Sequence, residues 1–416
     1  LGLRSAHTCY PTLRAAWRSL RALGSGTRGR DGAPSADAPR GRRALKKLDP
    51  EAFREQQREQ RRQRKAQRRE QAFRDASEVA ATDAGVKRRE RRLADPNNVM
   101  EHNAWDAVPW DEELEKEVAA LVRAQDTASD ERVAAIRGSS AAHWDAFYEL
   151  NLRAYKNRRY LRDEFPELAA LADREGQVRV LEVGCGPGSA VFPLLSQFPS
   201  VNVSACDISS TAVRLLKQHP AFDNKRCAAF VWDVAAGGPA DGEDGDGALP
   251  PELPPASVDV ALLIFVLSAL PPDRLRAAVR NVHAALRPGG VALFRDYGEF
   301  DAKQCKFAQK GTRLGERWYA RHDGTMAYFF TTTVVNELFE AAGFEGIEQS
   351  PLFDEPAPAA DVDAKAPSQA DTSAGAARHA ALCGAAYDKQ LTVNRKTQVR
   401  IWRVWVTGRF RKPALQ

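Results

Sequence analysis

From residue 178 onward, short apolar runs of strand length alternate with amphipathic stretches of helix length. This pattern predicts an α/β fold, a doubly wound Rossmann-like sheet whose parallel strands are covered on both faces. Strands are predicted at 178–183, 201–206, 227–232, 258–266 and 291–295, with a last strand in the run VRIWRVWVTGRF at 399–410. Helices are predicted at 188–197, 209–218, 272–286 and 333–342.

Other segments interrupt or precede this pattern. The turn-rich stretches 236–256 and 355–385 are predicted to be disordered surface insertions outside the chemistry. Residues 22–44 have the composition of a flexible linker, and 50–75 are good helix formers without an apolar stripe. Trp105 and Trp110 stand in a polar stretch, and this predicts that the segment docks on the folded domain.

The stretch VRVLEVGCGPG at 178–188 is the point around which the chain is organised. Its apolar run ends in three glycines at alternating positions, Gly184, Gly186 and Gly188. Glycine permits positive φ and lets the backbone approach a ligand with no Cβ in the way. A buried strand that leads into such a turn is typical of a site for a nucleotide-like ligand.

Acidic residues beside the glycines indicate which ligand. Glu182 precedes the first glycine, and Asp207 ends the next apolar run. A dinucleotide site has G-x-G-x-x-G spacing, whereas this chain has G-x-G-x-G. A carboxylate next to the loop would repel a pyrophosphate and favour a cationic ligand. Asp233 and the 264–268 region fall at the same edge of the predicted sheet.

Charge is distributed unevenly along the chain. Residues 1–98 carry 25 lysines and arginines against 12 acidic residues, whereas the other 318 residues carry 36 against 43. Such a basic block either binds nucleic acid through phosphate contacts or is a solvated arm. The six cysteines include no C-x-x-C pair and no histidine at zinc spacing, so reduced thiols and no metal site are expected.

The start of the chain carries a candidate targeting signal. No apolar run approaches the roughly 18 residues that a membrane span needs. Residues 1–30 contain six arginines and no acid, which fits either a mitochondrial transit peptide or an arginine-rich arm. We expect a cytoplasmic protein, with a mitochondrial location as the alternative.

An aromatic and basic cluster precedes the glycine stretch. The aromatic residues recur at roughly helical spacing, and basic residues follow; these are Trp144, Phe147, Tyr148 and Tyr155, then Lys156, Arg158, Arg159 and Arg162. One interpretation is a helix that packs its aromatic side chains on the core. The other is an aromatic lid over a cofactor, beside a basic surface for phosphates.

Motifs distributed over residues 99–416 resemble one family. The glycine stretch and the acidic end of the second strand resemble class I S-adenosylmethionine-dependent methyltransferases. Further motifs resemble one branch, the tRNA N3-methylcytidine methyltransferases that act on the anticodon loop: HNAWD (102–106), HWDAFYELN (143–151), LEVGCGPG (181–188), CDISSTAV (206–213), LIFVLSAL (263–270), LFRDYGEFD (293–301) and KGTRLGERWYARHDGTMAYFF (310–330). The HNAWD element is similar to the subgroup for threonine and arginine tRNAs.

The resemblance implies that three regions of the chain have different roles. It implies a basic, largely disordered tail at 1–98, an extension at 99–170 that binds RNA and covers the cofactor, and a methyltransferase domain at 171–416. The cofactor contacts that it implies are Trp144, Tyr148, Glu182, Gly184, Gly186, Asp207, Ile208, Asp233, Val234 and Ile264.

The reaction implied is transfer of a methyl group to N3 of a cytidine at position 32 of tRNA. Neutral cytosine already presents a lone pair at N3, so no strong base is required. In RDYG at 295–298, Asp296 is expected to contact the exocyclic amine, Tyr297 to stack on the base, and Arg295 to hold a phosphate or a carboxylate. A structural ion pair between Arg295 and Asp296 is the alternative.

Candidate RNA contacts come from two basic stretches. These are Lys156, Arg158 and Arg159, and then Arg313, Arg317, Tyr319, Arg321 and His322. The alternative for the second group is a basic β-hairpin with no ligand.

Three other readings of function stay open. The acceptor is a protein or small molecule instead of tRNA, the chain is a non-catalytic RNA-binding module, or the glycine loop binds nicotinamide, which Glu182 and the glycine spacing disfavour. An accessory protein or an aminoacyl-tRNA synthetase is a candidate partner.

Overall fold

The computed structural model describes residues 91, 93, 95–106, 108, 112–152, 155–237, 249–348 and 384–414. They belong to one compact unit, Ala81–Gln416. The predictions for the arginine-rich start, the linker, the charged helix at 50–75 and Trp110 lie outside the described residues, as does most of both insertions.

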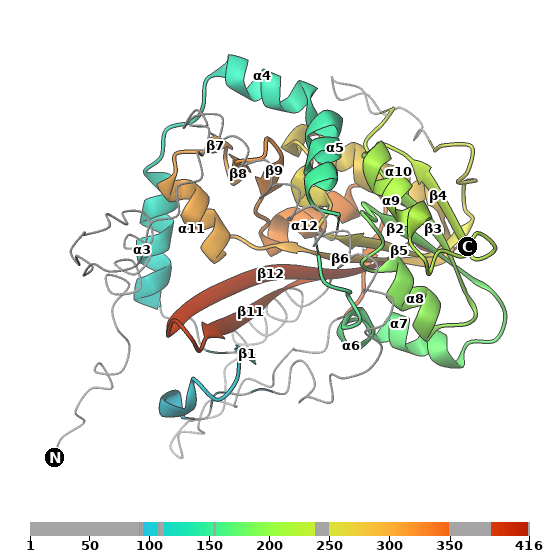
Figure 1. The fold of residues 1–416 in the computed structure, drawn as a ribbon, viewed down its shortest axis with the longest axis horizontal. Helices are drawn as coiled ribbons and strands as arrows, with labels where there is room; N and C mark the ends of the chain where they lie inside the picture. The colour runs from blue at the N-terminus through green and yellow to red at the C-terminus, as the bar shows by residue number, and fades with distance from the viewer. Residues whose placement is uncertain are drawn as a thin grey trace, which may run out of the picture. The chain divides into compact units, whose positions relative to one another are not determined.

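A mixed nine-stranded sheet forms the centre of this unit (Figure 1). Five parallel strands lie in the order β6-β5-β2-β3-β4. Their bounds are β2 Val178–Val183, β3 Val201–Asp207, β4 Cys227–Val231, β5 Val258–Ile264 and β6 Leu286–Tyr297. The doubly wound α/β sheet predicted from the apolar pattern is confirmed.

Antiparallel strands extend the sheet beyond β6. The last strand, β12 (Val399–Arg411), pairs with β6, and β11 (Ala385–Asn394) pairs with β12. Two short strands, β1 (Ala104–Asp106) and β10 (Glu345–Gly346), pair with β11 and β12. Trp105 is buried in β1, so the segment that carries it docks on the sheet as predicted.

Helices cover the sheet through two separate apolar clusters. Side chains of α10 (Leu275–Ala285) and α12 (Thr332–Glu340) pack on one face. Side chains of α6 (Leu161–Glu164), α7 (Pro166–Ala169) and α8 (Val191–Gln197) pack in the other cluster. Successive residues of a buried strand point to opposite faces, so Val180 joins the second cluster and Leu181 the first. This explains the near-continuous apolar runs in the sequence.

The remaining elements are helices and a second, three-stranded sheet. They comprise α3 (Glu112–Arg123), α4 (Asp130–Gly138), α5 (Ser140–Leu150), α9 (Ser210–Gln218) and α11 (Ala302–Gln309), the short 3₁₀ helices η2 (Pro96–Asn98), η3 (Ala170–Asp173), η4 (Leu267–Ala269) and η5 (Pro272–Arg274), and a second sheet of β7 (Arg313–Gly315), β8 (Trp318–Ala320) and β9 (Met326–Tyr328).

Three predicted boundaries need correction. The helix expected from 188 begins at Val191, because Gly188 has φ +95° and cannot start a right-handed helix. The fifth strand is longer than 291–295 at both ends. Finally, residues 249–256 are part of the folded unit, since Leu253 is buried in the core, although we predicted a disordered insertion there.

Candidate active site

The glycine loop after β2 forms the wall of a pocket at the carboxyl ends of the strands. Predicted cofactor residues that line it are Trp144, Tyr148, Gly184, Asp207, Ile208, Asp233 and Val234. The structure therefore brings together residues from α5, the glycine loop and the ends of β3 and β4. Glu182, Gly186 and Ile264 are not among the residues that line it. Ile264 is fully buried in the core, and the next residues, Phe265 and Val266, line the pocket instead.

Two glycines of the loop are required by conformation and by space. Gly184 has φ +62° and Gly186 has φ +51°. A Cβ at Gly184 would lie 2.6 Å from Cγ2 of Val266, and one at Gly186 would lie 2.9 Å from the Tyr148 hydroxyl. Side chains at either position would collide with the pocket wall, so the loop keeps its backbone open to a ligand.

Asp207 joins the glycine loop to the end of β3. Its carboxylate accepts hydrogen bonds from the backbone N–H of Gly186 and of Ser209, both at 2.9 Å. Burial raises the pKa of Asp207 to about 6, although both N–H donors oppose this. The carboxylate is therefore fixed at the pocket wall with free lone pairs for hydroxyl donors.

Glu182 is buried directly behind the loop. Its Oε2 atom has no hydrogen-bond partner among the described residues, and burial raises its pKa to about 8. An orphaned buried carboxylate oxygen is costly unless a ligand supplies a donor or a positive charge. The pocket thus fits a ligand with hydroxyls near Asp207, as S-adenosylmethionine has, while Glu182 lies behind the pocket wall and does not line it.

Helix α5 forms an aromatic cover over this pocket. Trp144 stacks on Tyr148 with ring centroids 5.8 Å apart. Asp145 holds the helix in place, because its carboxylate accepts hydrogen bonds from the Ser209 hydroxyl and the Thr211 N–H at the start of α9. Spacing alone left a core helix and a lid as equal interpretations, and the structure places both rings in the pocket wall.

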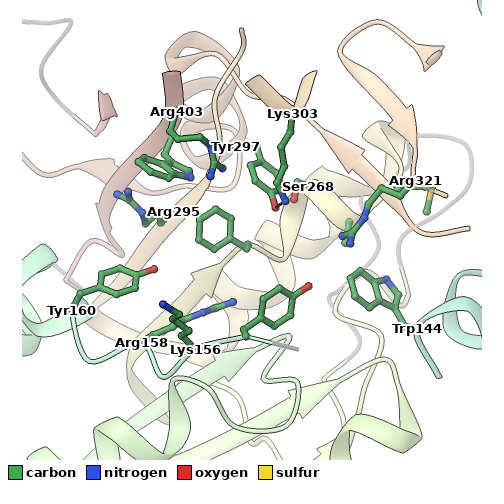
Figure 2. Close-up of a pocket in the computed structure, with 15 residues that line it drawn as sticks. Trp144, Lys156, Arg158, Tyr160, Ser268, Arg295, Tyr297, Lys303, Arg321 and Arg403 are labelled. Carbon is green, nitrogen blue, oxygen red and sulfur yellow. Dashed lines mark hydrogen bonds between the residues drawn. The ribbon is translucent and has the colours of Figure 1, made fainter. Parts of the chain in front are cut away.

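A second, larger cavity of about 430 Å³ adjoins the first (Figure 2). The two share Trp144, Phe265 and Ala269. None of the described residues that line the second cavity is acidic, whereas six are basic: Lys156, Arg158, Arg295, Lys303, Arg321 and Arg403. Aromatic rings fill the spaces between the basic groups. A cavity with this lining suits a ligand that combines a flat ring with a negatively charged phosphate, as a nucleotide does.

Phe265 is a site residue that sequence reasoning did not single out. It follows β5 at φ +58°, a rare conformation for a bulky residue that is frequent at functional sites. Its ring lies 5.3 Å from the ring of Tyr297. The sequence signal was its place at the carboxyl end of a buried strand, within the 264–268 region.

The RDYG residues take places that partly differ from our expectation. Tyr297 lines the cavity. Arg295 is fully buried and forms ion pairs with Glu164 and Asp388, both at 2.6 Å, so it holds carboxylates and is not free to hold an RNA phosphate. Arg295 does not form an ion pair with Asp296, so the alternative interpretation is wrong.

Asp296 lies behind the cavity wall. It is fully buried, and it accepts hydrogen bonds from the N–H of Ser268 at 2.9 Å and from its own neighbour Tyr297 at 2.8 Å. Burial raises the pKa of Asp296 to about 6, and the side chain and the N–H group of Ser268 oppose this rise. Asp296 therefore does not line the cavity itself, whereas its hydrogen-bond partner Ser268 does.

The predicted RNA contacts divide into two groups. Lys156, Arg158 and Arg321 line the cavity, and Arg159 and His322 are exposed. The other three lie elsewhere: Tyr319 is fully buried in an apolar cluster, Arg313 donates to the carbonyls of Gln125 and Gly315, and Arg317 pairs with Glu316. For these three, an inward position or a local partner replaces the expected RNA contact.

Replacing Glu182 with glutamine is expected to stabilise the ligand-free protein at high pH. The raised pKa means that Glu182 favours folding below its unfolded pKa, near 4.5, and that this contribution is lost as the pH rises through about 8. The glutamine amide does not ionise, so the variant keeps its stability as the pH rises. The melting temperature of Glu182→Gln should therefore exceed that of wild type by several degrees at pH 8.5 and match it near pH 4. Thermal unfolding across this range measures the difference, and equal curves at every pH would contradict it.

The strand order, the glycine loop and the carboxylates at the ends of β2 and β3 define a class I S-adenosylmethionine-dependent methyltransferase. A family model described as a methyltransferase domain matches residues 153–349. The chain is 34% identical over 359 residues to the zebrafish (Danio rerio) protein named tRNA N(3)-cytidine methyltransferase METTL2, with 77% of this chain and 88% of that protein covered. The chain belongs to the tRNA N(3)-methylcytidine methyltransferase family, and its cofactor is S-adenosylmethionine.

Two other relatives bear on the substrate. The human protein named tRNA N(3)-cytidine methyltransferase METTL6 is 37% identical over 242 residues, which cover 58% of this chain and 81% of that protein. The Saccharomyces cerevisiae protein named tRNA(Thr) (cytosine(32)-N(3))-methyltransferase is 33% identical over 331 residues, which cover 78% of this chain and 45% of that protein.

Among the described residues, no helix is long and apolar enough to cross a membrane. The same residues contain no cluster of metal-ligating side chains.

Proposed function

We propose that this enzyme methylates N3 of cytidine 32 in the anticodon loop of tRNA, with threonine tRNA as its main substrate and arginine tRNA as a second. The family supports the reaction, and the name of the yeast relative supports the position and the threonine tRNA. The HNAWD element supports the same subgroup. In the structure its Trp105 donates a hydrogen bond to the Val99 carbonyl at 2.8 Å and anchors the segment.

The observation that carries the proposal is the shared wall between the two cavities. Trp144, Phe265 and Ala269 belong to both, so a base in the cationic cavity would adjoin the cofactor pocket. S-adenosylmethionine supplies the activated methyl group. Cytosine N3 already carries a lone pair, so no residue of the chain needs to act as a base, and the task of the site is alignment.

The cavity offers a specific set of contacts for the base. Tyr297 and Phe265 present aromatic faces on which the ring can stack. Ser268 lines the cavity and its side chain lowers the pKa of Asp296, so we infer that its hydroxyl donates to Asp296 and that its lone pairs accept from the exocyclic amine of cytosine. Through this hydroxyl the Asp296 carboxylate stabilises the positive charge that the methylated ring acquires. Asp296 is therefore a positioning residue.

Replacing Asp296 with asparagine is expected to lower kcat about 10–100-fold while cofactor affinity changes less than threefold. The amide keeps the volume, but Ser268 and Tyr297 donate to different carboxylate oxygens, so the NH₂ group of the asparagine must face one of these N–H donors and Ser268 is no longer held in the same place. Steady-state methylation of tRNA and calorimetric titration with S-adenosylhomocysteine separate the two effects.

The matched control is Asp259→Asn. Asp259 lies on β5 and pairs with Arg287 at 2.7 Å, but it does not line either cavity. Its replacement is expected to leave kcat within twofold of wild type. If Asp296→Asn folds, binds cofactor and keeps full turnover, Asp296 has no role in positioning.

The substrate itself is tested with transcripts. Threonine tRNA should accept methyl groups, and the same transcript with uridine at position 32 should lose more than 99% of the signal, because uracil N3 carries a proton instead of a lone pair. Arginine and serine transcripts measure the choice among tRNAs. Repeating the assay with the cognate aminoacyl-tRNA synthetase measures whether a partner protein raises the rate. Equal transfer to cytidine-32 and uridine-32 transcripts would exclude this position.

A further inference from the structure

Four of the six basic residues around the second cavity already have partners in the protein. Arg295 pairs with Glu164 and Asp388, Arg403 with Asp301 at 2.8 Å, and Arg321 with Asp323 at 3.4 Å, and Arg158 donates to the Ile264 carbonyl at 2.7 Å. These contacts hold the four guanidinium groups in the wall of the cavity. Their charge contributes to the field in the cavity, and each of them already has at least one partner in the protein.

Lys303 differs from these arginines. It lies in the first turn of α11, and its ammonium group makes no ion pair with an acidic side chain among the described residues. Its hydrogen-bond partner is neutral, the Tyr297 hydroxyl, at 3.3 Å. Figure 2 shows Lys303 and Tyr297 pointing into the same part of the cavity. The ammonium group also lies 5.3 Å from the centre of the Tyr297 ring.

The surroundings of Lys303 favour an anion. Partial burial lowers its pKa first, and the positive charges of Arg403 and Arg321 lower it further. An unpaired ammonium group beside two guanidinium groups raises the energy of the site, and a bound anion would relieve this repulsion. The side chain is exposed enough to be reached from solvent, so the anion can enter.

We propose that Lys303 binds a phosphate that flanks the target cytidine while the base lies against Tyr297. The inference rests on the proposed function and adds a residue that fixes the nucleotide by its backbone. An ammonium group over the edge of an aromatic platform can contact a phosphate and the stacked base of the same nucleotide together. This contact binds any nucleotide equally, so it contributes affinity and does not select the base.

The test is the affinity of tRNA for the protein saturated with S-adenosylhomocysteine, measured by fluorescence anisotropy at several salt concentrations. Lys303→Ala is expected to weaken binding about tenfold, because it removes one charge-assisted hydrogen bond to a phosphate. The slope of log affinity against log salt should become shallower by about 0.7, the value for one phosphate contact on a single strand. Lys303→Arg should recover most of both effects.

Lys306→Ala is the matched control. Lys306 lies on the same helix and is exposed, but it does not line the cavity. Its replacement should change affinity less than twofold. In turnover assays, Lys303→Ala should raise KM for tRNA about tenfold and leave kcat within twofold.

Two results would overturn the inference: unchanged affinity and salt slope in Lys303→Ala, or an equal loss in Lys306→Ala. Either leaves the proposed function intact as long as the wild-type protein methylates tRNA. Failure of the proposed function has a different signature, since the wild-type protein would then transfer no methyl group to tRNA at any salt concentration.

Discussion

Replacing Asp207 with alanine is expected to weaken cofactor binding at least about 100-fold. We propose that Asp207 accepts two charge-assisted hydrogen bonds from the ribose hydroxyls; such bonds contribute roughly 1.5–3 kcal/mol each, and their loss alone accounts for this factor. The variant also leaves the N–H groups of Gly186 and Ser209 without their acceptor, so the glycine loop loses its link to β3. Calorimetric titration with S-adenosylhomocysteine measures the change.

Two variants give this prediction its controls. Asp207→Asn keeps the shape and one acceptor oxygen, so its affinity should fall between those of wild type and Asp207→Ala. Asp223→Ala removes an exposed aspartate from the turn before β4, whose carboxylate accepts from the Lys225 N–H, and it should bind cofactor within twofold of wild type. If Asp207→Ala binds within threefold of wild type, the ribose is held elsewhere.

Replacing Arg295 with alanine is expected to destabilise the protein by about 3–5 kcal/mol. The guanidinium group neutralises Glu164 from α6 and Asp388 from β11 in a fully buried site, and it lies 4.7 Å from the ring of Trp405. Its removal leaves the two buried carboxylates without this positive charge. The melting temperature should fall by roughly 10 °C, measured by circular dichroism or calorimetry.

A comparison with Arg409 separates the effect of burial on stability from the effect of charge. Arg409 on β12 pairs with Glu167 at 2.6 Å in a more exposed position, and Arg409→Ala should cost about 1 kcal/mol or less. If Arg295→Ala is too unstable to purify, the triple variant Arg295→Met, Glu164→Gln, Asp388→Asn should regain at least half of the lost stability. A melting temperature of Arg295→Ala equal to that of wild type would show that the triad is not structural.

The sequence predicted the parallel half of the sheet well. Its strands are buried on both faces, so their apolar runs stand out, and the glycines mark where β2 ends. For the same reason the acids at strand ends, such as Asp207, fell at the correct edge of the pocket. These features depend on local composition and on a topology rule that needs no long-range information.

The antiparallel half was harder to predict because its buried positions are polar. Strand β11 reads AAYDKQLTVN, in which Asp388 and Gln390 are buried. Asp388 is satisfied by Arg295, and Gln390 donates to Asp106 at 2.6 Å. These partners lie far away in sequence, so a strand with a satisfied polar interior looks like an exposed loop. Asp296 was placed in the cavity for the same reason, because its hydrogen-bond donors in η4 could not be foreseen.

The most direct test of the account uses the purified chain with methyl-labelled S-adenosylmethionine and total tRNA. After digestion to nucleosides, chromatography with mass spectrometry identifies the labelled product. The account predicts label in 3-methylcytidine, with Asp207→Ala as the inactive control. Label in a different nucleoside, or no label in tRNA from protein that binds the cofactor, would contradict it.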